Sequence, residues 1–205
     1  NMHDMHLPEN LLAVARAGAG VNNIPLTSCA DQGIVVFNTP GANANSVMEL
    51  ALCGMLLASR DIIGGVNWVQ SIKDSSEIGR LVEKGKSQFA GHEISGKKLG
   101  IQAYGNVGRL VAEKAKALGM EVMAFDPFVP AERMIEEGVT PAASLESMYE
   151  QCNFISLHIP AVPATIGSIG YDLISRMPRG GCLVNTARKE VMNEVELEKV
   201  LSDRP

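Results

Sequence analysis

A short glycine-containing turn is the first feature of the sequence that could do chemistry. The apolar run Leu99 to Gln102 leads into Ala103-Tyr104-Gly105-Asn106-Val107-Gly108, and a helical pattern from Asn106 to Leu118 follows. Backbone N–H groups at a helix start bind phosphate, and glycine lets a diphosphate approach the chain. Ala103 stands where such turns usually carry a first glycine. We expect a dinucleotide to contact Gly105, Asn106, Val107 and Gly108.

An acidic residue follows the next apolar run. Asp126 ends the run Glu121 to Phe125, about 20 residues beyond Gly105. A carboxylate there hydrogen-bonds the adenosine ribose and repels a 2′-phosphate, so the sequence predicts NAD rather than NADP. The alternative is a glycine-rich turn beside an ordinary surface aspartate, and the strand-helix-strand context argues against it.

Short apolar runs alternate with helical patterns through the second half of the chain. The runs lack strict alternation of apolar and polar residues, as strands covered on both faces do. Short linkers between them imply right-handed crossovers and a doubly wound parallel sheet of the α/β class. The expected strands are Leu99–Gln102, Glu121–Phe125, Phe154–Leu157 and Cys182–Asn185, and the expected helices are 106–118, 131–137, 144–151, 171–177 and 194–201.

The first half begins with a similar pattern. We expect strands at 11–15 and 34–37, with a helix between Ile24 and Gly33. A longer helix is predicted at 43–60, started by a capping box of Ser46 and Glu49. The more polar segment 61–98 is expected to form helical pieces, anchored by Trp68, Val69 and Ile72.

Composition excludes several classes of protein. With 46% apolar and 20% charged residues, the chain of 205 residues is typical of a globular protein. Its net charge of −5 and the lack of a basic cluster argue against nucleic acid as a partner. The longest apolar stretch, 50–58, is shorter than the roughly 20 residues of a membrane helix. We therefore expect no membrane association.

The cysteines indicate neither a metal site nor a disulfide framework. No Cys-x-x-Cys spacing occurs, and each cysteine has apolar neighbours. The sequence predicts buried, reduced thiols in a cytoplasmic protein, at Cys29, Cys53, Cys152 and Cys182.

Longer stretches of the sequence resemble the D-isomer-specific 2-hydroxyacid dehydrogenase family. The resemblance implies a Rossmann-type NAD-binding domain, a flavodoxin-like substrate lobe, and catalysis in the cleft between them. It implies a remnant of the substrate-binding domain at 1–42, an interdomain helix and connecting segment at 43–98, and an incomplete NAD-binding domain at 99–205. Because the chain opens with Asn1 rather than Met, we expect a fragment truncated at both ends. The matching stretches are 15–24, Asn38-Thr39-Pro40-Gly41-Ala42-Asn43 with Val47 and Glu49, the turn at 103–108, 156–160 and 183–188.

The same resemblance implies roles for individual residues. Arg188 matches the catalytic arginine, whose guanidinium fork can hold a 2-oxo acid and polarise its carbonyl. Arg16 matches a residue that contacts a substrate phosphate, although it could equally pair with a neighbouring acid. Gly18, Ala19 and Gly20 match the loop whose amides bind the substrate carboxylate, with Ala19 near the nicotinamide.

Other matching residues would line the cofactor. His158, Ile159 and Pro160 would lie on the adenine side, and Thr186, Ala187 and Arg188 would approach the nicotinamide. For His158 we favour this role over proton transfer. The family's proton-exchanging histidine and its glutamate partner, which follow the arginine, have no match here, and Lys189 replaces the usual glycine after Arg188. Truncation explains this most simply, and a copy unable to complete proton transfer is the alternative.

The expected activity is NAD-dependent oxidation of 3-phosphoglycerate to 3-phosphohydroxypyruvate, the first step of serine biosynthesis. The substrate would then be a phosphorylated 2-hydroxy acid. Alternatives are another 2-hydroxyacid dehydrogenase, acting on glyoxylate, hydroxypyruvate or lactate, and a non-catalytic NAD-sensing scaffold. The helix at 43–60 carries apolar residues on more than one face, which predicts a homodimer.

Overall fold

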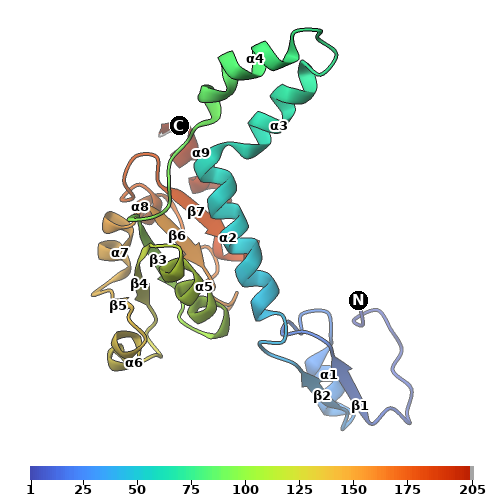
Figure 1. Ribbon diagram of the computed structural model, residues 1–205. Coiled ribbons are helices and arrows are strands. Elements are labelled where there is room, and N and C mark those ends of the chain that lie inside the picture. Colours follow the sequence, from blue (N-terminus) through green and yellow to red (C-terminus); the bar gives the residue numbers. More distant parts are fainter. Residues whose placement is uncertain (204–205) are drawn as a thin grey trace. The chain divides into compact units, whose positions relative to one another are not determined.

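The computed structural model describes residues 1–203, which form two compact units, residues 1–47 and the residues from 48 onward (Figure 1). The first unit contains a two-stranded parallel sheet of β1 (Ala13–Arg16) and β2 (Val35–Asn38), connected through helix α1 (Leu26–Asp31). Its small core is built from Leu7, Ile24, Cys29 and Ile34.

The second unit is organised around a five-stranded parallel sheet. Its order across the sheet is β5-β4-β3-β6-β7, which confirms the predicted doubly wound α/β fold. The sequence patterns located every strand but the two-residue β5. The strands are β3 (Lys98–Gln102), β4 (Glu121–Phe125), β5 (Thr140–Pro141), β6 (Phe154–Leu157) and β7 (Cys182–Asn185).

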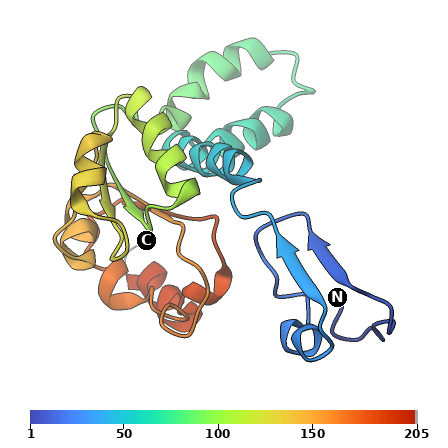
Figure 2. The same ribbon diagram turned by 90° about the horizontal axis from the view of Figure 1, so that it is seen from below.

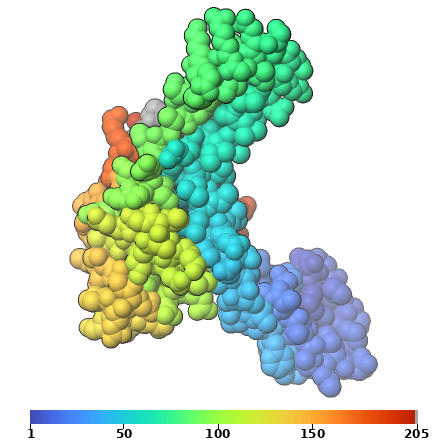
Figure 3. All heavy atoms as spheres, viewed as in Figure 1, coloured from blue at the N-terminus to red at the C-terminus, as the bar shows by residue number. Residues whose placement is uncertain are grey.

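Helices cover both faces of this sheet (Figure 2). One face is packed by α2 (Ala44–Arg60), α5 (Asn106–Ala117) and α6 (Ala131–Glu136), and α2 and α5 lie side by side there (Figure 3). The other face is packed by α7 (Leu145–Gln151), α8 (Tyr171–Ile174) and α9 (Glu194–Asp203).

Strand β3 shows why these runs carry apolar residues without alternation. Leu99 and Ile101 pack under α5 in one core, so their neighbours must meet the opposite layer. There, a Cβ added at Gly100 would lie 2.6 Å from Cδ1 of Ile155 and 2.8 Å from Cγ of Met148. Glycine at this position therefore lets α7 approach the sheet.

Most helix ends lie within one or two residues of the prediction, and two of the differences have a local explanation. The chain turns before Ser46, since the amide of Ala44 donates to the carbonyl of Gly41 at 3.0 Å, so Ser46 lies within α2 and does not cap it. Helix α8 ends at Ile174 rather than Met177, and residues before Pro178 are biased away from helical geometry.

The prediction of buried side chains fails at two positions. Cys53 is exposed on α2 and Cys182 is half-buried, whereas Cys29 and Cys152 are buried as expected.

The segment 61–98 forms α3 (Ile62–Ser71), α4 (Ile78–Gly85) and η1 (Lys86–Phe89). Of its predicted anchors, Trp68 packs against Phe89 but Val69 is exposed. A second single-turn helix, η2 (Lys189–Val191), precedes α9. Among residues 1–203, no helix is long and apolar enough to cross a membrane.

Candidate functional site

The candidate site lies where the order of strands reverses. From β3 the chain proceeds outward to β4 and β5 and then returns to β6 on the other side of β3. Doubly wound sheets bind ligands in the crevice beyond the carboxyl ends of their strands at this point. The turn 103–108 follows β3, Asp126 follows β4, His158 follows β6 and Thr186 follows β7, so the sheet brings these predicted residues to one edge.

The turn after β3 leaves room for a ligand at the start of α5. A Cβ added at Gly105 would meet no heavy atom within 4 Å. Gly105 is the residue before the helix and offers no side chain to cap it, so the first N–H groups of α5 are available to an anion. At Gly108 an added Cβ would lie 2.3 Å from the carbonyl oxygen of Ala103, so only glycine permits this packing of helix on strand.

Ala103 takes the backbone conformation that glycine usually supplies. Its φ of 75° lies in the left-handed region. The turn thus keeps the geometry of a dinucleotide-binding loop, at a conformational cost that glycine would not carry.

Asp126 is held by the backbone on both sides of its carboxylate. Oδ2 accepts from the amide of Tyr104 and Oδ1 from the amide of Phe128, each at 2.8 Å. Each carboxylate oxygen can accept more than one hydrogen bond, so ribose hydroxyls could still be bound. These amides fix the orientation of the group.

His158 lies after β6 and is half-buried, with its ring largely shielded from solvent. Its Nε2 lies 3.0 Å from Oγ of Ser156, and its amide donates to the carbonyl of Gln102 at 2.9 Å. Burial lowers the pKa of His158 to about 4, so the ring is neutral at pH 7 and a weak base. This favours a wall of the site over proton transfer. Beside it, Ile159 is buried and Pro160 is exposed.

The loop after β7 is ordered by Asn185. Its Oδ1 accepts from the amide of Ala187 at 3.0 Å, and its Nδ2 donates to the carbonyl of Arg188 at 2.9 Å. Arg188 is exposed, and among residues 1–203 its guanidinium has no carboxylate partner, donating only to the carbonyl of Ala187 at 2.9 Å. The guanidinium is therefore available to an anionic ligand.

The residues present fit NAD. The first-turn amides of α5 suit a diphosphate, and Asp126 suits the two ribose hydroxyls. Thr186, predicted near the nicotinamide, has a buried Oγ1 without a hydrogen-bond partner among the described residues. A buried hydroxyl without a partner is uncommon in folded proteins, and a carboxamide could supply one.

The other predicted residues form a loop in the first unit. The amide of Gly18 donates to Oγ1 of Thr39 at 2.8 Å, and Asn38 Nδ2 donates to the carbonyl of Ala19 at 2.9 Å. Arg16 Nε donates to the carbonyl of Gly20 at 3.2 Å, so this guanidinium lies against the loop instead of pairing with an acid among the described residues.

Sequence reasoning did not identify one group beside the turn. Tyr104 and Arg109 both donate to the carboxylate of Glu137, which follows α6. Tyr104 occupies a position of the glycine motif at which no particular residue type is required, and it lies far from Glu137 in the sequence. No local spacing therefore indicates the contact.

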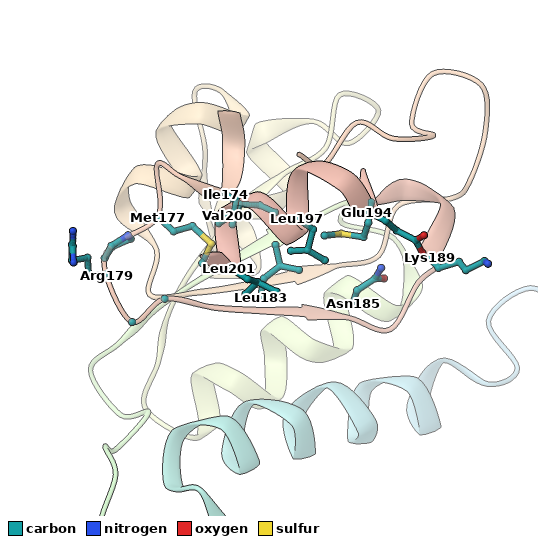
Figure 4. Close-up of a pocket in the computed structure, with 14 residues that line it drawn as sticks. Ile174, Met177, Arg179, Leu183, Asn185, Lys189, Glu194, Leu197, Val200 and Leu201 are labelled. Carbon is teal, nitrogen blue, oxygen red and sulfur yellow. The ribbon is translucent and has the colours of Figure 1, made fainter. Parts of the chain in front are cut away.

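A separate cavity of about 460 Å³ opens beside the edge strand β7, between β7 and α9 (Figure 4). Leu183 faces Leu197 and Leu201 across it. None of the predicted cofactor residues lines this cavity, although Asn185 and Lys189, which flank the loop of Thr186, Ala187 and Arg188, do.

Comparisons with known proteins agree with this geometry. Residues 53–205 match the family model described as the D-isomer specific 2-hydroxyacid dehydrogenase, NAD binding domain. The chain is 37% identical to hydroxypyruvate reductase from Thermotoga maritima, covering 96% of this chain and 60% of that protein. It is 34% identical to D-3-phosphoglycerate dehydrogenase from Methanocaldococcus jannaschii, covering 95% of this chain and 35% of that one.

A solved structure has a similar fold. NAD⁺-bound 3-phosphoglycerate dehydrogenase from Entamoeba histolytica superposes with a TM-score of 0.75 at 36% identity, covering 96% of this chain and 55% of that one. The chain thus spans between about a third and three fifths of the length of these relatives. Together with the glycine turn and the parallel sheet, the family match establishes that the chain belongs to the D-isomer specific 2-hydroxyacid dehydrogenase family and carries its NAD-binding domain.

Proposed function

We propose that the protein is an NAD-dependent D-2-hydroxyacid dehydrogenase that oxidises 3-phosphoglycerate to 3-phosphohydroxypyruvate. The observation that carries the proposal is the convergence of three features on one sheet edge. They are the open start of α5, the oriented carboxylate of Asp126 and the guanidinium of Arg188, which has no carboxylate partner among residues 1–203. The family match supports the dehydrogenase activity.

The chain's residues would share the work of binding and orientation. Amides of the first turn of α5 hold the diphosphate, and Asp126 accepts from the adenosine ribose. When bound, NAD⁺ supplies the acceptor for the hydride from the substrate C2. Arg188 holds the substrate carboxylate and polarises the developing carbonyl. The hydroxyl proton would be released to water or to a general base other than His158, because the low pKa of His158 makes it a poor acceptor.

Phosphate recognition would come from the first unit. Arg16 lies against the loop of Gly18, Ala19 and Gly20, and we assign Arg16 to the phosphate. The amide of Gly18 already donates to Thr39, so we assign the amides of Ala19 and Gly20 to the carboxylate. Two relatives named for different substrates, hydroxypyruvate reductase and D-3-phosphoglycerate dehydrogenase, match at similar identity. A hydroxypyruvate reductase is therefore the second candidate.

The test uses the full-length protein, NAD⁺ and matched substrates. We expect NADH formation with 3-phosphoglycerate at a kcat/KM well above that with D-glycerate. Arg16→Ala should raise the KM for 3-phosphoglycerate by about 10-fold or more, while barely changing the KM for D-glycerate. The control is Arg80→Ala, which removes an exposed arginine whose ion pair is with Glu77, at the start of α4.

Three outcomes separate the alternatives. Faster reduction of hydroxypyruvate by NADH than oxidation of 3-phosphoglycerate, with no selective effect of Arg16→Ala, would favour the reductase. NADH binding without turnover of any 2-hydroxy acid would favour a scaffold. No binding of NADH would contradict the whole proposal.

We also propose that the protein forms a homodimer through α2 and α3. Exposed apolar side chains on these helices support it: Leu50 and Leu56 on α2, and Ile63 and Val66 on α3. Sedimentation of the full-length protein at micromolar concentration should give a dimer, and Leu50→Glu should shift it toward monomer. A monomeric wild-type protein would contradict this assignment.

A further inference from the structure

Glu137 is not one of the predicted site residues, yet its carboxylate accepts hydrogen bonds from several side chains around the nucleotide turn. Its Oε2 accepts from the hydroxyl of Tyr104 at 2.8 Å and from Nε of Arg109 at 2.9 Å. Its Oε1 accepts from a second nitrogen of Arg109 and from Nε of Arg133 at 3.4 Å. Lys116 donates to its main-chain carbonyl. One residue at the end of α6 therefore contacts the turn and α5 together.

Tyr104 transmits this contact to the loop. Its side chain is buried in the core beneath α5, and its amide donates to Asp126 Oδ2 at 2.8 Å. The residue is therefore bonded at its hydroxyl to Glu137 and at its amide to Asp126. The residue directly before Gly105 has little freedom to move.

Arg109 provides the second connection. It lies in the first turn of α5, and its amide makes a 3.0 Å hydrogen bond to the carbonyl of Gly105. Residues held by Glu137 thus stand on both sides of the segment Gly105 to Gly108.

We propose that Glu137 is a positioning residue for NAD, which holds the diphosphate-binding turn in its binding geometry through Tyr104 and Arg109. The inference rests on the proposed NAD site but not on any particular hydroxy acid. Glu137 itself need not touch the cofactor.

The conformation of Ala103 explains why the turn needs the hydrogen bonds to Glu137. Its positive φ of 75° is unfavourable for a residue with a side chain, so the turn tends to relax unless its surroundings hold it. The Glu137 carboxylate is charged at neutral pH, and hydrogen bonds from Arg109, Tyr104 and Arg133 lower its pKa to about 2. Charged acceptors bind donors more strongly than neutral ones. A preformed turn binds its ligand without first paying the entropy of ordering.

The test measures NADH affinity of the full-length protein by calorimetry or fluorescence. Glu137→Gln should raise the Kd for NADH by about 10-fold, and Tyr104→Phe by about 3-fold or more. At saturating NAD⁺, kcat and the KM for the hydroxy acid should stay near wild type, because only the cofactor turn is disturbed. Glu137→Asp, which keeps the charge, should recover part of the affinity.

Matched controls lie elsewhere in the same unit. Glu150→Gln removes an ion pair of comparable length, the 2.7 Å contact of Glu150 with Arg176. Tyr149→Phe removes a buried tyrosine hydroxyl that donates to Gln102 at 2.8 Å. Both should lower stability without changing the Kd for NADH by more than about 2-fold.

A double substitution tests the route of action. If Glu137 acts through Tyr104, Glu137→Gln should have a smaller effect on the Kd in the Tyr104→Phe background than in the wild type. Hydrogen exchange of the amides at 103–109, measured without cofactor, should speed up in Glu137→Gln and not in Glu150→Gln. If Glu137→Gln does not fold, the Tyr104→Phe result decides.

The inference is overturned if the wild type binds NADH and neither Glu137→Gln nor Tyr104→Phe weakens it beyond the controls. That result would leave the NAD site itself intact. A wild type that fails to bind NADH would instead remove the proposed function and this inference with it.

Discussion

The main-chain amide of Tyr104 donates a 2.8 Å hydrogen bond to Oδ2 of Asp126, and this bond joins the two halves of the nucleotide site. The glycine turn follows β3 and the acid follows β4; the pairing of these strands brings the two segments together, and this contact fixes the carboxylate against the turn. The carboxylate therefore has a structural task in addition to its expected contact with ribose.

Replacing Asp126 should change both coenzyme choice and local stability. Asp126→Asn removes the charge that repels a 2′-phosphate. It also places the side-chain NH₂ of asparagine, a hydrogen-bond donor, against a backbone N–H group that is a donor too. We expect NADH affinity to fall by about 10-fold and the preference for NADH over NADPH to narrow. Paired titrations with NADH and NADPH measure this. Glu121→Gln, at the opposite end of the same strand, is the control, and an unchanged preference would refute the assignment.

Ala103→Gly should not destabilise the protein. A left-handed conformation costs a residue with a side chain about 1–2 kcal/mol. Glycine costs about 0.5–1 kcal/mol in additional unfolded-state entropy. The free energy of unfolding should therefore stay unchanged or rise by up to about 1.5 kcal/mol in urea titrations. Ala115→Gly, buried within α5, should instead lower it by about 1 kcal/mol or more. Equal losses at both positions would contradict the left-handed geometry.

His158 should make stability depend on pH in the weakly acidic range. Burial lowers its pKa from 6.5 to about 4, so between these values the unfolded chain binds a proton that the folded protein does not. The contribution of the neutral His158 ring to the free energy of unfolding is fully present above pH 6.5 and is lost as the pH falls toward 4. His158→Gln should remove this part of the loss in unfolding measurements across that range. A difference between wild type and variant that stays constant with pH would show that the ring is not buried.

The ionisation of Glu137 should affect stability at a lower pH than that of His158. Hydrogen bonds, first from Arg109 and then from Tyr104 and Arg133, lower its pKa from 4.5 to about 2 against the opposing effect of desolvation. Its contribution is present above pH 4.5 and is lost as the pH falls toward 2. The stability advantage of wild type over Glu137→Gln should shrink across this window. An advantage that persists at pH 2 would contradict the ion-pair origin.

The fold was largely accessible from the sequence because its strands are buried on both faces. Strands β4, β6 and β7 begin and end where their apolar runs do, and Gly119 and Gly138 close α5 and α6 with positive φ. Strand β5 has only two residues, one of them a proline, and leaves no pattern to detect.

The contacts that order the site were less accessible. Glycine and aspartate positions mark the nucleotide turn by local spacing, but Tyr104 meets Glu137 only because α5 and α6 pack on the same face of the sheet. Cys53 was predicted buried from its apolar neighbours, but Ala51 and Met55 face the core, whereas Cys53 is exposed, as are Leu50 and Leu56. Composition around a residue indicates its element, not which side of that element meets the core.

The backbone at Ala103 has a consequence for how such proteins are found. A search pattern that demands glycine at the first place of the motif would reject this chain, although the chain makes the same bend there. What the turn requires at that place is a positive φ, and alanine adopts it here. Motif definitions written in torsion space would recover homologues that letter-based ones discard.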